Sequence, residues 1–271
     1  MSLVSHRGLL RASLRAVARG RALRAERRLK LAGPLLLRAF ADCFPEAVFV
    51  EIGANDGEQH DHLGPLIRAY RWRGVMVEPV PYVFAKLERN YAGINRVALE
   101  NVAIADRDGT KPFYHLGAVE DHERAGLPRW YDGIGSFSRA AVIDHVRLIP
   151  DIERRLVATQ VTCLTFASLC ERHGFGDIDL LVIDTEGYDH EILRHIDFTR
   201  YRPALVVYEH YHLDPDDLAQ TRELMRSAGY ETMAEGFDTW CLLPDADRAL
   251  GEVWRSLQPG LPELTVDSEP R

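Results

Sequence analysis

From residue 48 onward, apolar runs of strand length alternate with segments of helix length. The runs are apolar throughout rather than at every second position, which is typical of strands buried on both faces of a parallel sheet. The predicted strands cover residues 48–52, 74–78, 96–104, 179–184 and 204–209. The predicted helices cover residues 58–72, 81–92, 165–174, 187–197 and 214–228. This alternation predicts an α/β fold, a doubly wound and mostly parallel sheet covered by helices.

Two segments break the alternation. Residues 230–235 and 238–243 flank Gly236-Phe237, which predicts an antiparallel hairpin at the end of the sheet. Residues 116–158 are interrupted by glycine and proline and fit neither a strand nor a long helix, so we expect an insertion over the site. A parallel sheet closed by a C-terminal antiparallel hairpin resembles the layout of Rossmann-like methyltransferases.

The pattern also sets the expected domain limits. Residues 1–45 form a basic helical extension, residues 46–245 the main domain with its insertion, and residues 246–271 a C-terminal tail. In the extension, arginines recur every four residues with leucine and valine between them, which predicts a basic amphipathic helix. Such a helix could be solvated, dock on this chain, lie on an anionic membrane or a partner, or act as a targeting segment.

Composition and charge narrow the class of protein. The chain of 271 residues is 46% hydrophobic and 27% charged, as in ordinary globular proteins, and has no apolar run of the ~20 residues that span a bilayer. Residues 1–30 hold eight arginines and one lysine against one glutamate, a formal charge of +8. Because the net charge of the whole chain is −8, residues 31–271 carry −16. An acidic body argues against nucleic acid as a partner. The four cysteines are too sparse for a disulfide scaffold, so we expect a cytoplasmic protein, or one peripheral to a membrane through residues 1–30.

The stretch VFVEIGANDG runs from a buried strand into a glycine turn. Such a turn lies at the carboxyl edge of a doubly wound sheet, where ligands bind and glycine lets the backbone approach them. Asn55 and the preceding Glu51 would crowd or repel a pyrophosphate, but they suit a cation. The turn therefore predicts a cationic, nucleoside-bearing ligand such as S-adenosylmethionine. The expected contacts are Glu51, Gly53, Ala54, Asn55 and Gly57.

The next two predicted strands add to this site. The second ends in GVMVEP, which places Glu78 at the spacing of an acid that binds ribose hydroxyls, with Pro79 beside it. The third contains ENVAI, and we expect Asn101 and Ala103 to lie near an adenine ring.

Further along, the stretch IDLLVIDTEGYDHEIL predicts a buried strand that is followed by Asp184, Glu186, Asp189 and His190. These acids could hold a metal, act as a base, hold the amino group of the cofactor or cap the helix. The fifth strand ends in VVYEHYH, so Glu209, His210 and His212 should leave the sheet beside Asp184.

Together EIGANDG, the VEP ending, NVAIADRDG and IDTEGYDHEIL followed by YEH resemble FkbM-type methyltransferases over about residues 46–243. The resemblance implies an S-adenosylmethionine-dependent enzyme that methylates a hydroxyl oxygen on a sugar, polyketide or other secondary metabolite. It implies that Glu51, Gly53, Asn55 and Gly57 form the cofactor turn and that Glu78 binds the ribose. It also places Asp184 and Glu186 beneath the transferred methyl group.

An oxygen acceptor requires removal of a proton. We expect Asp184, Glu209 and His210 to form one catalytic cluster, with His190 as a further candidate base. We favour a metal-free site with His210 as base and assign no metal ligand; a divalent ion, Mg²⁺ or Mn²⁺, is the alternative. Aromatic residues and arginines of the insertion suit a glycan or an acidic acceptor, or a lid that packs on the sheet. The competing functions are a non-catalytic scaffold that binds S-adenosylmethionine and a nucleotide-dependent dehydrogenase; the oligomeric state stays open.

Overall fold

The computed structural model describes residues 32–59, 62–122 and 124–257. The expectations for residues 1–30 and for the last residues of the tail, 258–271, lie outside the described residues. Within them, no helix has the length and the apolar character needed to cross a bilayer. The four cysteines are all unpaired thiols.

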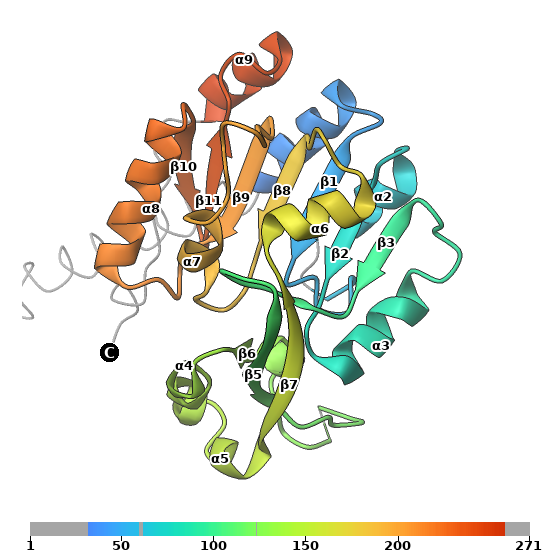
Figure 1. The fold of residues 1–271 in the computed structure, drawn as a ribbon, viewed down its shortest axis with the longest axis vertical. Coiled ribbons are helices and arrows are strands. Elements are labelled where there is room, and N and C mark those ends of the chain that lie inside the picture. Colours follow the sequence, from blue (N-terminus) through green and yellow to red (C-terminus); the bar gives the residue numbers. More distant parts are fainter. Residues whose placement is uncertain (1–31, 60–61, 123, 258–271) are drawn as a thin grey trace, which may run out of the picture.

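A seven-stranded sheet forms the centre of the protein, in the order β10-β11-β9-β8-β1-β2-β3 (Figure 1). Its strands are β1 Val48–Ile52, β2 Arg73–Val77, β3 Val97–Glu100, β8 Leu180–Ile183, β9 Leu205–Glu209, β10 Glu231–Glu235 and β11 Asp238–Leu242. The first five pair in parallel, whereas β11 pairs antiparallel with both β9 and β10. The predicted α/β fold with a C-terminal hairpin is confirmed. The strand order reverses between β1 and β8, which is where doubly wound sheets bind ligands.

Helices cover both faces of this sheet, as the fully apolar strands require. One face packs against α6 Phe166–His173, α7 Asp189–Leu193 and α8 Pro215–Ser227. The other packs against a helix over residues 32–43 and against α2 Gly64–Ala69, α3 Pro81–Asn90 and α9 Arg248–Leu257. Successive residues of β1 alternate between the two cores, Phe49 on one side and Val50 on the other.

The segments at both ends of the main domain belong to its core. Leu36 and Phe40 of the first helix are fully buried, although residues 32–43 lie in the expected N-terminal extension. In α9, within the expected C-terminal tail, Trp254 is buried and its indole N–H donates to Glu231 Oε2 at 2.7 Å. These helices are short and amphipathic, so their tertiary contacts stabilise them more than helix propensity does.

A second sheet of four strands, in the order β4-β7-β5-β6, lies below the main sheet in Figure 1. Its strands are β4 Ala103–Ile104, β5 Gly109–Leu116, β6 Gly135–Ser136 and β7 Leu156–Leu164. The predicted strand over residues 96–104 is therefore two strands, which separate at Asn101 and enter different sheets. The expected insertion, residues 116–158, connects β5 to β7 and contains η1 Arg129–Gly133, α4 Arg139–Ile143, η2 Asp144–Arg147 and α5 Ile152–Arg155. It has an apolar core of its own around Tyr131.

Candidate active site

The glycine turn after β1 is held tightly between the ends of β2 and β8. The backbone N–H groups of Gly53 and Ala54 both donate to Val77 O, at 2.9 and 3.0 Å. Gly53 has φ +85°, and a Cβ at this residue would lie 1.7 Å from Asp184 O. Only glycine permits both this conformation and this approach. Asn55, with φ +49°, is one of two non-glycine residues in the left-handed region among those described. Gly57 also has positive φ.

Glu78 follows β2 and closes the turn from the side. It is 6% exposed, and its carboxylate accepts hydrogen bonds from the backbone N–H groups of Asn55 at 3.1 Å and Val80 at 2.7 Å. Burial raises the pKa of Glu78 to about 7, against the opposing effect of these two hydrogen bonds. Each carboxylate oxygen keeps a second acceptor site, so the group can still bind the hydroxyls of a ribose.

The other expected cofactor contacts are distributed around this turn. Asn101 Nδ2 donates to Glu78 O at 2.8 Å and to Pro79 O at 3.2 Å, so its exposed side chain fixes the chain after β2. Glu51 and Ala54 are buried. Ala103, in β4 of the second sheet, is also buried and pairs with Cys163 of β7.

Asp184 and Glu209 form an acidic pair where β8 and β9 end. Desolvation, followed by repulsion from neighbouring carboxylates of which Glu186 contributes most, raises the pKa of Asp184 well above its usual value. Desolvation and then the Asp184 carboxylate raise the pKa of Glu209 in the same way. Asp184 is crowded by protein atoms but remains solvent-accessible, and Glu209 Oε2 is buried without a hydrogen-bond partner among the described residues. Two carboxyl groups that disfavour ionisation are suited to accepting a proton or a cation.

Two further acids, Asp189 and Asp238, lie beside this pair at the end of β9. Asp189 is fully buried and accepts hydrogen bonds from Thr185 Oγ1 at 2.7 Å and from the backbone N–H of Glu209 at 3.2 Å. It therefore fixes the loop after β8 to the end of β9. Burial raises the pKa of Asp189 to about 6. Asp238 of β11 lies opposite Glu209 in the strand register, and burial raises the pKa of Asp238 to about 7.

Two histidines do not join the accessible cluster. His210 is 0% exposed, and its Nδ1 lies 3.0 Å from Thr239 Oγ1. His190 is 5% exposed, and its Nδ1 lies 2.7 Å from Thr221 Oγ1 of α8. Both side chains face the interior, one toward the hairpin and the other between two helices. The structure therefore does not bring His210 and His190, the expected candidate bases, into the accessible cluster with Asp184.

His212 lies where His210 was expected. Its Nε2 is 3.0 Å from Glu186 Oε2 and 3.9 Å from Glu209 Oε1, and the side chain is partly exposed. Because β9 ends at Glu209, strand alternation does not determine the directions of the His210 and His212 side chains.

The insertion contacts this edge of the sheet. A Cβ on Gly133 would lie 3.4 Å from Asn55 Nδ2 and 3.7 Å from Glu186 Oε1. Asp132 is buried and joins the insertion to α3, because it forms an ion pair with Lys86 and accepts a hydrogen bond from Tyr82 Oη at 3.1 Å. Sequence patterns do not reveal this arrangement, because it depends on contacts between distant segments.

Among the aromatic residues of the insertion, Tyr131 and Phe137 have packing roles. Tyr131 is fully buried and donates to Gly117 O at 2.9 Å, and the Phe137 ring lies 4.8 Å from that of Tyr188. Trp130 is partly exposed and begins a row of rings that crosses to the hairpin. Successive centroids in this aromatic row, Trp130, His145, His212, Tyr211 and Phe237, are 5.8, 5.6, 4.9 and 4.6 Å apart.

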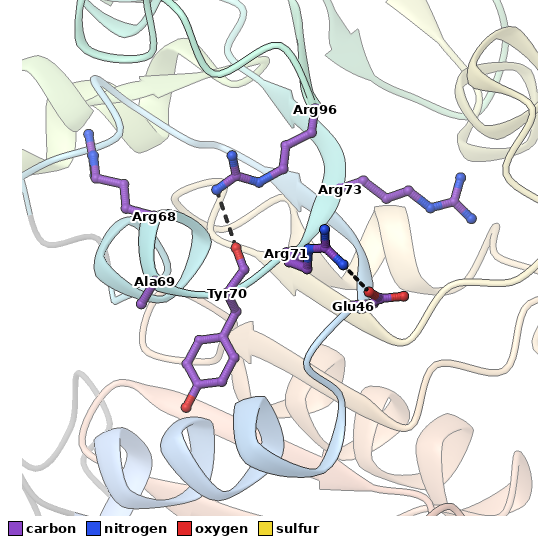
Figure 2. A pocket seen from close by; sticks show the side chains of 7 residues that line it. All are labelled: Glu46, Arg68, Ala69, Tyr70, Arg71, Arg73 and Arg96. Atoms are coloured by element: carbon purple, nitrogen blue, oxygen red, sulfur yellow. Dashed lines mark hydrogen bonds and ion pairs between the residues drawn. The ribbon is translucent and has the colours of Figure 1, made fainter.

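A recess elsewhere on the protein does not belong to this site. It lies at the amino ends of β1, β2 and β3 and is lined by Glu46, Arg68, Ala69, Tyr70, Arg71, Arg73 and Arg96 (Figure 2). Within it Arg71 pairs with Glu46 at 3.2 Å, and Arg96 donates to Tyr70 O at 3.3 Å. The glycine turn and the acids lie at the carboxyl ends of the strands, so the basic recess is at the opposite edge of the sheet.

Comparison with known proteins gives one family. The family model described as "Methyltransferase FkbM domain" matches residues 51–232, more than half of the chain. This range includes the glycine turn, Glu78, Asp184 and Glu209. No curated protein matches.

Solved structures give weaker likenesses. One is a methyltransferase FkbM from Methylobacillus flagellatus KT, with 13% identity, a TM-score of 0.46, and coverage of 73% of this chain and 44% of that chain. An Aeropyrum pernix fibrillarin with natively bound S-adenosyl-L-methionine has 10% identity, a TM-score of 0.35 and coverage of 72% and 66%. An RNA methyltransferase from Salinibacter ruber in complex with S-adenosyl-L-homocysteine has 14% identity, a TM-score of 0.35 and coverage of 79% and 94%. These values are too low to carry an argument about activity.

Proposed function

The chain belongs to the FkbM methyltransferase family, and we propose that it transfers a methyl group from S-adenosylmethionine to a hydroxyl oxygen of a sugar, a glycan or another secondary metabolite. One observation carries the proposal. Acids gather where β1, β2, β8 and β9 end, and among the described residues no arginine or lysine forms an ion pair with Glu78, Asp184 or Glu209. Such a site favours a ligand that brings positive charge.

The residues present fit this cofactor. S-adenosylmethionine carries a sulfonium and an ammonium group and supplies an electrophilic methyl group. Glu78 is fixed by two backbone N–H groups and would bind the ribose, with Asn101 and Pro79 holding the chain beside it. Asn55 Oδ1 is buried and has no hydrogen-bond partner among the described residues, so it offers a further acceptor at the turn. Asp184 and Glu51 place two further carboxyl groups at the same edge.

The acidic pair would handle the proton. An alcohol must lose its proton as its oxygen is methylated, and a positioned base contributes about 10²- to 10⁴-fold to such a step. Glu209 is the stronger candidate because its Oε2 lacks a hydrogen-bond partner within the described part of the chain. Asp184 is the accessible neighbour that holds the pair at the end of β8. His210 and His190 are omitted from this role because both imidazoles are buried and bonded to threonine hydroxyls.

The aromatic row supports a carbohydrate or a similar ring-shaped acceptor. Trp130 at one end and Phe237 at the other, 50% exposed, offer apolar faces, and His212 between them in the row lies 3.9 Å from Glu209 Oε1. Flat apolar faces beside hydrogen-bonding groups are the combination that binds sugar rings. Nucleic acid is not proposed, because the formal charge of residues 31–271 is −16, the total of −8 less the +8 of residues 1–30.

The proposal is tested by transfer of an isotopically labelled methyl group. The purified chain is incubated with labelled S-adenosylmethionine and separate pools of oligosaccharides, hydroxylated small metabolites and RNA, and the labelled product is identified by mass spectrometry. We expect an O-methylated product from a hydroxylated pool that Glu209→Gln reduces about 100-fold. Label on RNA, or on a nitrogen or carbon atom, would contradict it. Binding of S-adenosylmethionine without turnover on any pool would favour the scaffold alternative.

A further inference from the structure

Three potential metal ligands from separate segments meet at the joint between the insertion and the main sheet. His145 lies in η2, Glu186 in the loop after β8, and His212 in the loop after β9. One ligand atom from each lies within 4.8 Å of the other two. All three side chains are partly buried, so they are neither sealed in the core nor free on the surface. The insertion is thus connected to the sheet through a cluster of metal-binding residue types.

The backbone holds two of these residues in a fixed arrangement. Glu186 has φ +53°, a conformation that few residues other than glycine adopt, and Gly187 follows with φ +95°. A Cβ on Gly187 would lie 3.3 Å from both Cβ and O of His212. The turn therefore packs directly on the His212 segment, and Glu186 Oε2 lies 3.0 Å from His212 Nε2. This contact keeps the two ligands together before any ion arrives.

His145 completes the set from the other side. Its ring centroid is 5.6 Å from that of His212, and its Nδ1 lies 3.3 Å from O of Val142 in the adjoining helix α4. If Nδ1 carries the proton and donates to this carbonyl, Nε2 has the lone pair that a metal needs. A backbone carbonyl in this role is the usual way of orienting a histidine ligand.

The donor set defines the class of ion. Two imidazoles and one carboxylate suit first-row transition ions such as Zn²⁺, whereas Mg²⁺ and Ca²⁺ prefer oxygen ligands alone. The surrounding charge also favours a cation, because Glu209 Oε1 is 3.9 Å from His212 Nε2 and Asp184 lies close by. Three protein ligands leave a tetrahedral ion at least one position for water or an oxygen of a bound molecule.

We propose that His145, Glu186 and His212 bind one divalent first-row transition ion of the Zn²⁺ class, which fixes the insertion to the carboxyl edge of the main sheet. This ligand set differs from the Asp184, Glu209 and His210 cluster expected from the sequence. The proposal does not depend on the identity of the methyl acceptor. The competing account is an ion pair between protonated His212 and Glu186, with no role for a metal.

Metal binding is measured directly, without an activity readout. The untagged full chain is treated with a chelator, dialysed, and titrated with Co²⁺ while its visible absorption is recorded, and with Zn²⁺ by calorimetry. We expect one ion per chain and micromolar or tighter affinity, and we expect a 50-fold excess of Mg²⁺ not to displace it. His212→Ala, Glu186→Gln and His145→Ala should each weaken binding at least tenfold.

The matched control is His195→Ala. His195 also lies near a glutamate, with Nε2 3.9 Å from Glu191 Oε2, but its side chain is 41% exposed and lies outside the cluster. This variant should bind Co²⁺ like the unaltered chain. Circular dichroism and calorimetry with S-adenosylmethionine verify that each variant is folded, so loss of the cofactor site is distinguishable from loss of the metal site. The proposal is overturned if no ion binds at one per chain with a dissociation constant below ~100 μM, a value far weaker than that of typical protein zinc sites. It is also overturned if the His212, Glu186 and His145 variants bind the ion as tightly as the control does.

Discussion

Replacement of Gly53 by alanine tests the tight contact on which the candidate active site depends. Gly53 adopts φ +85°, and an added Cβ would lie 1.7 Å from the carbonyl oxygen of Asp184 and 2.7 Å from its carbonyl carbon. The left-handed conformation costs an L-residue about 1–2 kcal/mol. The clash is with backbone rather than with a flexible side chain, so β1 and β8 must separate, and overpacking of this kind costs about 1–3 kcal/mol. We expect Gly53→Ala to lower the free energy of unfolding by about 2–5 kcal/mol.

Gly93 provides a matched control. It has φ +88°, nearly the same as Gly53, but a Cβ there would meet no atom within 4 Å. Gly93→Ala should therefore cost only the conformational penalty of about 1–2 kcal/mol. Urea unfolding followed by circular dichroism gives both values. Equal losses for the two variants would refute the argument that the β1 turn touches the end of β8, and no loss for either would refute the backbone conformation.

Three further predictions concern Glu78, the choice of base between His210 and Glu209, and residues 1–30. Because burial raises the pKa of Glu78 to about 7 from 4.5, the folded state binds more protons between these values, and the free energy of unfolding should fall as pH rises through this window, by about 3 kcal/mol for this group. Urea unfolding at several pH values should show that the free energy of unfolding depends less on pH in Glu78→Gln than in the unaltered chain. An unchanged pH dependence would contradict the prediction. His210→Ala should lower the free energy of unfolding. Glu209→Gln should instead lower kcat about 100-fold while affinity for S-adenosylmethionine is retained, as measured by single-turnover assays and calorimetry. A loss of kcat in His210→Ala but not in Glu209→Gln would restore His210 as the base. Deletion of residues 1–30 should leave cofactor binding intact and abolish association with anionic vesicles, measured by cosedimentation; a truncated chain that fails to fold would place this segment in the core.

Much of the fold follows from local patterns. The strands of the main sheet are apolar throughout, so the alternation of strands and helices predicts both the parallel sheet and its helical layers. The carboxyl ends of parallel strands share one edge, which is why the sequence predicts that the glycine turn, Glu78 and Asp184 come together. The second sheet was not predicted because β5 and β7 mix polar and apolar residues and pair across the long insertion.

The side chains at the end of β9 show where sequence patterns stop being informative. His210 and His212 are equally plausible in the string VVYEHYH, but β9 ends at Glu209, and the hairpin then encloses His210. His145 gave no signal because its partners lie in distant segments. Helix α9 lies within the expected tail, and its ten residues are marginal as an isolated helix without the contacts that bury Trp254.

Isothermal titration of the full chain with S-adenosylmethionine tests the central claim most directly. We predict saturable binding at one molecule per chain, no binding of NAD under the same conditions, and a loss of about 1–3 kcal/mol of binding free energy in Glu78→Ala, the cost of removing a buried hydrogen-bonding group. The variant Glu88→Ala, on the adjacent helix α3, serves as the control and should bind normally. Binding of NAD without binding of S-adenosylmethionine, or full affinity in Glu78→Ala, would contradict the account.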